Sequence, residues 1–122
     1  MRDDTLPVID RSYELTRWFL HHLAKFARSH RYGLGKRIEE RLFGILEGLV
    51  SARYSGDAVR VECLQRVNLD LEILRMEARL AHELRLLATG SHEYAVREMA
   101  EIGRMVGGWL KQQKRAKPSS TG

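Results

Sequence analysis

The chain of 122 residues is 43% hydrophobic and 30% charged, with a formal charge of +5, a balance that suits one folded domain and excludes a disordered one. No apolar run is long enough to cross a bilayer, and the first residues lack the apolar core of a signal peptide. The single cysteine, Cys63, excludes a disulfide within one chain, so we expect a cytoplasmic protein with no membrane partner.

The two prolines, Pro7 and Pro118, lie near the ends of the chain, so nothing between them prevents long helices. Turn-forming residues occur at 32–35, 55–57 and 89–91 and divide the sequence into four helical segments. Because the connections are short, successive helices should lie antiparallel beside each other. The pattern therefore predicts an all-α fold, an antiparallel up-down four-helix bundle.

The first helix is expected from about Asp10 to Ala27, with the side chain of Asp10 or Ser12 capping its N-terminus. The second is expected from about Lys36 to Tyr54, because apolar residues recur there at steps of three and four. The predicted buried faces of these two helices are Leu15, Trp18, Phe19, Leu23 and Phe26, and Ile38, Leu42, Ile45, Leu46, Leu49 and Val50.

The third helix is expected from Asp57, its capping residue, to about Ala88, and its apolar residues cover more than a narrow stripe. Such a helix contacts neighbours on two sides within one bundle, or contributes to a subunit interface. The fourth helix is expected from Ser91 to Leu110. Beyond it the sequence becomes basic and polar, so we expect one bundle domain, residues 1–110, followed by a basic flexible tail, 111–122.

Two glycine pairs lie within predicted helices, Gly44 with Gly48 and Gly103 with Gly107. Each interior glycine costs about 0.5–1 kcal/mol of helix stability relative to alanine, so another interaction should offset that cost. Glycines four residues apart share one face of a helix and permit close approach of another backbone. Either tight packing within the bundle or contact between subunits would account for them.

Sixteen of the 21 basic residues are arginines, which bind phosphate and carboxylate groups in a fork and stack on bases. The net charge favours a polyanionic partner, which is nucleic acid, an acidic protein or an anionic membrane surface. Some arginines have acidic partners one helical turn away, in the series Glu62, Arg66 and Asp70 and in the pair Arg79 and Glu83. We expect those to be solvated surface pairs of little energy.

The basic residues of the first turn and of the tail have few acids nearby in the sequence, so they are available to phosphate groups. Tyr32 lies among these cations and is placed to stack on an exposed base. A merely solvated basic turn is the alternative. The candidate residues for contact with nucleic acid or another partner are Arg28, Arg31, Tyr32, Lys36, Arg37, Arg41, Arg75, Arg79, Lys111, Lys114 and Arg115.

The five histidines show none of the spacings used by metal sites, and the sequence has neither a phosphate-binding glycine loop nor a nucleophile triad. We therefore expect no metal, no cofactor and no catalytic residue. One enzymatic alternative is open. Arg17 with His22, and Arg75 with His82, have the spacing of the small helical ribonucleases of the HEPN class, in which histidine handles the proton and arginine the phosphate charge.

Three segments of the sequence are distinctive: RYGLGKRI at residues 31–38, LVSARY at 49–54 and EIGRMVGGWLK at 101–111. Together with Leu6-Pro7 and the segment 18–26, they resemble the accessory variability determinant (Avd) family of diversity-generating retroelements, over nearly the whole chain. Related four-helix proteins encoded in ribosomal-RNA intervening sequences carry a proline in the second helix. This chain has none there, so the Avd branch fits better.

The resemblance implies a four-helix bundle that assembles into a basic, ring-like homopentamer. The partners that it implies are the reverse transcriptase of the retroelement and the template RNA or its cDNA. The protein would support mutagenic cDNA synthesis and would have no catalytic activity of its own.

Overall fold

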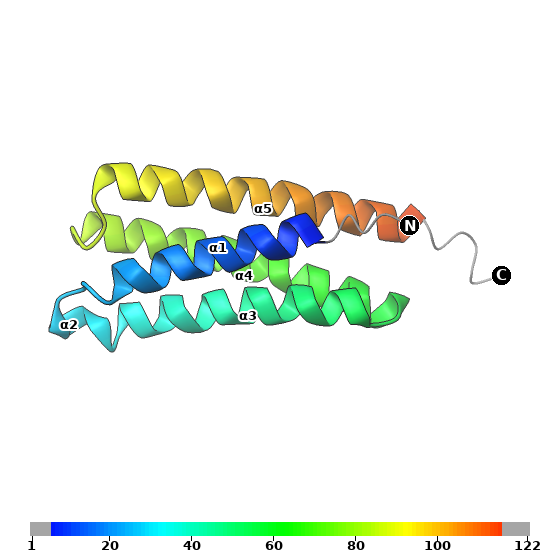
Figure 1. Cartoon of the computed structure of the whole chain (residues 1–122), viewed down its shortest axis with the longest axis horizontal. Coiled ribbons are helices and arrows are strands. Elements are labelled where there is room, and N and C mark those ends of the chain that lie inside the picture. The colour runs from blue at the N-terminus through cyan, green and yellow to red at the C-terminus, as the bar shows by residue number, and fades with distance from the viewer. Residues whose placement is uncertain (1–5, 116–122) are drawn as a thin grey trace.

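The computed structural model describes residues 6–115, which form four long helices and one short helix, with no strand among them (Figure 1). The expected all-α four-helix bundle is confirmed. The helices are α1 (Leu6–Leu23), α2 (Arg28–Arg31), α3 (Leu34–Tyr54), α4 (Asp57–Glu83) and α5 (Thr89–Arg115).

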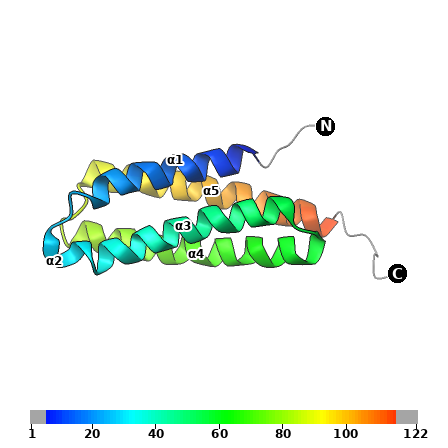
Figure 2. The same cartoon turned by 60° about the horizontal axis from the view of Figure 1, so that its bottom comes forward.

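The four long helices alternate in direction, and each packs against two others (Figures 1 and 2). Helix α1 lies between α3 and α5, and α4 lies between the same two helices on the other side. The connections after α1 and after α4 are therefore at one end of the bundle. The connection between α3 and α4 and the last turn of α5 are at the other end (Figure 1).

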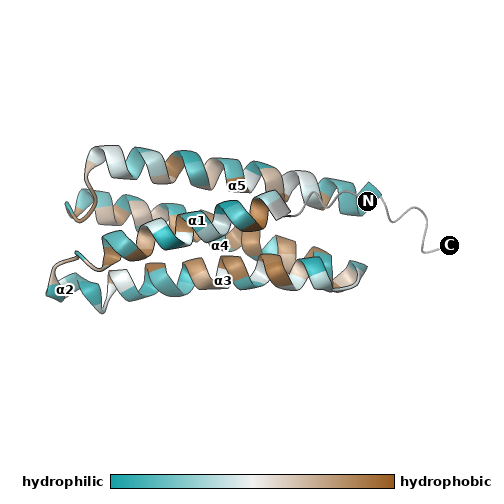
Figure 3. Ribbon diagram, in the orientation of Figure 1, coloured by the Kyte–Doolittle hydropathy of each residue, from teal (hydrophilic) through white to brown (hydrophobic). Residues whose placement is uncertain are grey.

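The bundle has one core, to which all four long helices contribute. Buried apolar residues recur at steps of three and four along the helices, so each helix presents an apolar stripe and a polar surface (Figure 3). The most deeply buried large side chains are Leu15, Phe19, Ile38, Leu42, Leu49, Leu64, Leu71, Leu74, Met99 and Ile102. Leu46 and Val50, expected inward, are only half-buried or exposed.

The first helix begins at Leu6 and ends at Leu23, four residues earlier at each end than expected. A proline is tolerated in the first turn of a helix, where its missing N–H has no partner to lose, so Pro7 does not delay the start. Neither expected cap is used, because both residues lie inside the helix. Ser12 is buried, and its carbonyl accepts a hydrogen bond of 2.8 Å from the Thr16 hydroxyl.

Helix α4 ends at Glu83 rather than Ala88, because Arg85 takes a left-handed backbone conformation with φ of 62°. This turn returns Leu87 to the core, where it is 2% exposed. At the other end of α4, Gly56 is the N-cap residue and Asp57 makes no capping hydrogen bond. Helix α5 begins at Thr89, before the expected cap, Ser91.

Helix α5 continues to Arg115, so the expected boundary at residue 110 lies five residues before the observed end of the helix. The reason is a polar cluster that the sequence pattern did not show. Gln113 is buried, and its amide donates a 2.7 Å hydrogen bond to Asp57 and accepts one of 3.3 Å from Arg60. The rest of the expected tail, 116–122, lies outside the described residues.

The glycines of α3 allow close packing against α4. A Cβ added to Gly48 would lie 2.7 Å from Cγ2 of Val67, and one added to Gly44 would lie 3.6 Å from an Asp70 oxygen. Close packing within the bundle therefore accounts for Gly48, whereas a Cβ at Gly44 would make an ordinary van der Waals contact. On α5, by contrast, a Cβ on Gly107 would meet open space. Within residues 6–115, no helix combines the length and apolarity needed to span a membrane.

Candidate nucleic-acid interface

Five basic residues surround the connection from α1 to α3, and we call this group the cationic end: Lys25, Arg28, Arg31, Lys36 and Arg37. The sequence produces it directly, because residues 15–38 contain six arginines and lysines and no aspartate or glutamate. Two core contacts fix the connection. Phe26 is 5% exposed, and Gly35 packs closely enough that a Cβ there would lie 3.4 Å from the His30 carbonyl oxygen.

The arginines of the cationic end are not neutralised within the bundle. Arg28, Arg31 and Arg37 are exposed, and none of them has a carboxylate within ion-pair distance among residues 6–115. Lys36 lies 3.5 Å from Glu39, but both side chains are well exposed, so the pair is weak. The charge of this end is therefore available to a partner.

Tyr32 stands at the centre of this group, between α2 and α3. Its side chain is 72% exposed, an unusually open position for a large aromatic residue. The guanidinium of Arg31 lies over the ring, 5.9 Å from its centroid. The exposed ring and the adjacent cations match the features of sites that hold single-stranded nucleic acid.

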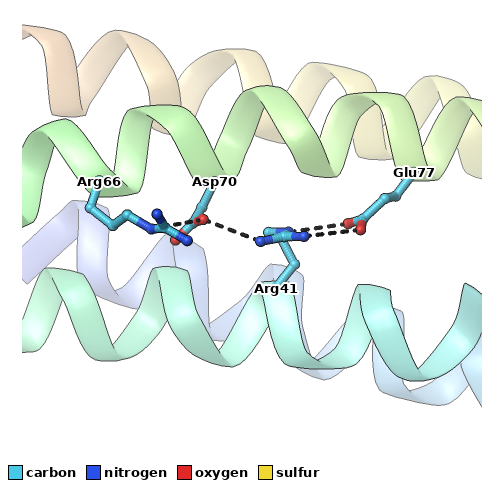
Figure 4. A network of polar contacts seen from close by, with 4 residues as sticks. All are labelled: Arg41, Arg66, Asp70 and Glu77. Carbon is cyan, nitrogen blue, oxygen red and sulfur yellow. Dashed lines mark hydrogen bonds and ion pairs between the residues drawn. The ribbon is translucent and has the colours of Figure 1, made fainter.

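Arg41, in contrast, is engaged inside the bundle (Figure 4). Its guanidinium donates to both oxygens of Glu77, at 3.4 and 3.3 Å, and to Asp70 at 3.4 Å. Asp70 is 4% exposed and also pairs with Arg66 at 3.4 Å. The hydrogen bonds that Arg41 donates to Glu77 raise the pKa of Arg41 above its usual value. The network joins α3 to α4, and Arg41 is committed to it.

Two further candidate arginines, both on α4, also have acidic partners. Arg75 lies 2.5 Å from Glu72, and Arg79 lies 3.1 Å from Glu83, the pairing expected from the sequence. Arg75 also approaches the Met99 carbonyl oxygen at 3.5 Å, on α5. Arg75 and Arg79 thus differ from Arg28, Arg31 and Arg37 in having a carboxylate at ion-pair distance, although exposed pairs of this kind are weak.

The candidates from the last two turns of α5, namely Lys111, Lys114 and Arg115, are at the opposite end of the bundle (Figure 1). The 21 residues of α3 separate the two ends by roughly 30 Å. The structure therefore does not bring the candidates onto one surface, and these three lie far from the cationic end.

The profile of the bAvd-like family matches residues 8–113, which is most of the chain. The chain belongs to the bAvd-like family. The resemblance to the Avd family seen in the sequence is thereby confirmed, and this family consists of accessory proteins of diversity-generating retroelements. No protein of curated function and no solved structure showed significant similarity to the chain.

Two cations of this bAvd-like chain were missing from the sequence-based set. Lys25 belongs to the same acid-free segment, which was the signal that identified its neighbours. Arg85 is exposed in the connection between α4 and α5, at the same end of the bundle as α2 (Figure 1). The sequence placed it within a helix, so its position in a connection at this end of the bundle was not expected.

The residue pairs of the ribonuclease alternative do not come together in the bAvd-like fold. Arg17 pairs with Glu14, whereas His22 contacts the Trp18 carbonyl at 3.0 Å and the Ser91 hydroxyl at 3.5 Å. On α4, His82 stacks on His92 with ring centroids 4.6 Å apart, and Arg75 pairs with Glu72 instead.

Burial and the nearby His82 lower the pKa of His92. In the part of the chain that the structure describes, no three side chains of the metal-binding types cluster.

Proposed function

We propose that the protein is a non-catalytic accessory protein of a diversity-generating retroelement that binds the reverse transcriptase and the template RNA through the cationic end. One observation supports this most strongly. Arg28, Arg31 and Arg37 are exposed and have no carboxylate at ion-pair distance among residues 6–115, in a chain that belongs to the bAvd-like family. Phosphate groups or an acidic polymerase surface would supply the missing partners.

The proposed mechanism is electrostatic scaffolding. Cations that neutralise phosphates release condensed counterions, which gives RNA affinity without dependence on sequence. The protein holds the template RNA near the polymerase and thereby supports mutagenic cDNA synthesis in the cytoplasm. No bond-breaking step is assigned to any of its side chains.

A homopentamer would multiply the charge of each subunit and add multivalent affinity. An exposed apolar stripe on α4 supports self-association, because monomeric proteins seldom leave such a stripe open to water. Leu69, Met76, Leu80 and Leu84 are 44–61% exposed and recur along one side of the helix. Light scattering should give the mass of a pentamer, and replacing Met76 and Leu80 with glutamate should lower it to that of a monomer. A monomeric wild-type protein would contradict this part of the proposal.

The binding surface is tested by charge reversal. Replacing Arg31, Lys36 and Arg37 with glutamate should abolish binding to both the template RNA and the reverse transcriptase. Because all three side chains are exposed, helical circular dichroism should not change. Binding is measured by fluorescence anisotropy for RNA and by co-purification for the polymerase.

The matched control reverses Lys111, Lys114 and Arg115, which makes the same change in net charge at the opposite end of the bundle. It should retain most of the affinity. If the control loses binding and the first variant binds normally, the binding surface is at the end of the bundle that contains Lys111, Lys114 and Arg115, and not at the cationic end. Unchanged affinity in both would reject the proposal.

A further inference from the structure

The cationic end includes a hollow of about 350 Å³ between the last turns of α1 and the first turns of α3. One wall is apolar and consists of Leu20 and Leu23 of α1 and the following residue, Ala24. Tyr32 forms part of the opposite wall, with its ring largely open to solvent. An exposed aromatic ring and apolar side chains that line one hollow suit a planar, weakly polar group such as a nucleobase.

Three ionic side chains line the same hollow, namely Arg31, Lys36 and Glu39. Glu39 pairs with Lys36 at 3.5 Å, so together the three carry one net positive charge. That charge matches a single phosphodiester group. The hollow therefore offers one aromatic surface and one net cation, which is the composition of one nucleotide site.

We propose that this hollow binds one unpaired nucleotide of RNA, with its base stacked on Tyr32 and its phosphate at Arg31 and Lys36. This inference rests on the proposed function, because it assigns the RNA contact to a particular place on the cationic end. The RNA must be single-stranded there, since the bases of a duplex are stacked on one another and cannot reach the ring.

A second hollow of about 350 Å³ adjoins the first and shares Leu20 and Ala24 with it. It continues along the groove between α1 and α3, where Tyr13 is 56% and Phe43 is 40% exposed. The strand leaving the first nucleotide thus has further aromatic side chains along its path. This extension favours a polynucleotide over a free nucleotide as the occupant.

The chain supplies a matched control for the aromatic contact. Tyr54 also follows an arginine at the end of a helix, is 77% exposed and has the Arg53 guanidinium 5.3 Å from its ring centroid. It lies at the other end of α3, far from the hollow. An effect that depends only on an exposed tyrosine beside an arginine should appear equally at both positions.

The test measures the affinity of the full chain for a fluorescein-labelled oligouridylate, alone and annealed to oligoadenylate. Tyr32→Ala should weaken binding of the single strand about 5- to 150-fold, the loss expected for one base–aromatic stack. It should leave the duplex affinity and the salt dependence unchanged, because no cation is removed. Tyr32→Phe and Tyr54→Ala should bind like the wild-type protein.

Three results would overturn the proposal. The first is a change of less than about twofold for Tyr32→Ala on the single strand. The second is an equal loss for Tyr32→Ala and Tyr54→Ala, or for strand and duplex. The third is a Tyr32→Ala protein that binds the single strand normally but no longer co-purifies with the reverse transcriptase. That result would assign the hollow to a protein partner. If the wild-type protein binds neither RNA at low salt, the proposed function itself fails, and that outcome is distinct from these three.

Discussion

The α3–α4 interface and the cationic end contain the same kind of residue in opposite circumstances. Arg37 and Arg41 are one turn apart on α3. Arg41 forms hydrogen bonds with Asp70 and Glu77, whereas Arg37 is exposed without a carboxylate at ion-pair distance in the region 6–115. The comparison shows that a count of basic residues does not identify a binding surface. What matters is whether the fold brings a carboxylate to each cation.

The largest expected difference between Arg41 and Arg37 is in their contribution to the free energy of unfolding. Arg41→Ala should lower the free energy of unfolding by about 2–3 kcal/mol, because it leaves Glu77 and the buried Asp70 without their shared partner. Arg37→Ala should change it by less than about 0.5 kcal/mol. Both values come from denaturation in guanidinium chloride, followed by circular dichroism.

For RNA binding, we expect the larger effect from Arg37→Ala and the smaller one from Arg41→Ala. Arg37→Ala should weaken it, and any Arg41→Ala protein that remains folded should bind normally. Equal loss of stability in the two variants would show that the network of Figure 4 does not join the helices as described.

The glycines give a smaller effect of the same kind. Gly48→Ala should destabilise the protein by about 1–2 kcal/mol, because the new methyl group would press on the stiff side chain of Val67. Gly107→Ala should stabilise it by about 0.5–1 kcal/mol, since that position is open and alanine is the better helix former. Melting temperatures of the two variants should therefore move in opposite directions. A decrease in both would mean that α5 also packs closely at Gly107, as in a subunit contact.

Local patterns in the sequence predicted the four long helices and the position of the cationic end. Apolar spacing defined α3 almost to the residue, and the acid-free segment identified Arg28, Arg31 and Arg37. The hydrogen bonds between Arg41 and Glu77 could not be predicted from local patterns, because Glu77 lies 36 residues further along the chain.

The same limit explains the errors at helix ends. Helix α5 continues past its expected end at Leu110, and its Gln113 side chain donates a hydrogen bond to Asp57, 56 residues away in the sequence. The end of α4 depends on the left-handed conformation of Arg85, a residue type that does not signal such a turn. The spacing of apolar residues therefore could not predict features that depend on contacts between distant residues or on unusual backbone angles.

The salt dependence of RNA affinity tests most directly whether RNA is bound by the cations that have no carboxylate at ion-pair distance among residues 6–115. The triple variant Arg28→Ala, Arg31→Ala and Arg37→Ala is compared with Arg66→Ala, Arg79→Ala and Arg104→Ala, whose arginines each pair with an acid on the same helix. On single-stranded RNA, the first variant should reduce the slope of log affinity against log salt concentration by about two, and the second should leave it nearly unchanged. Equal slopes for the two triple variants would contradict the account.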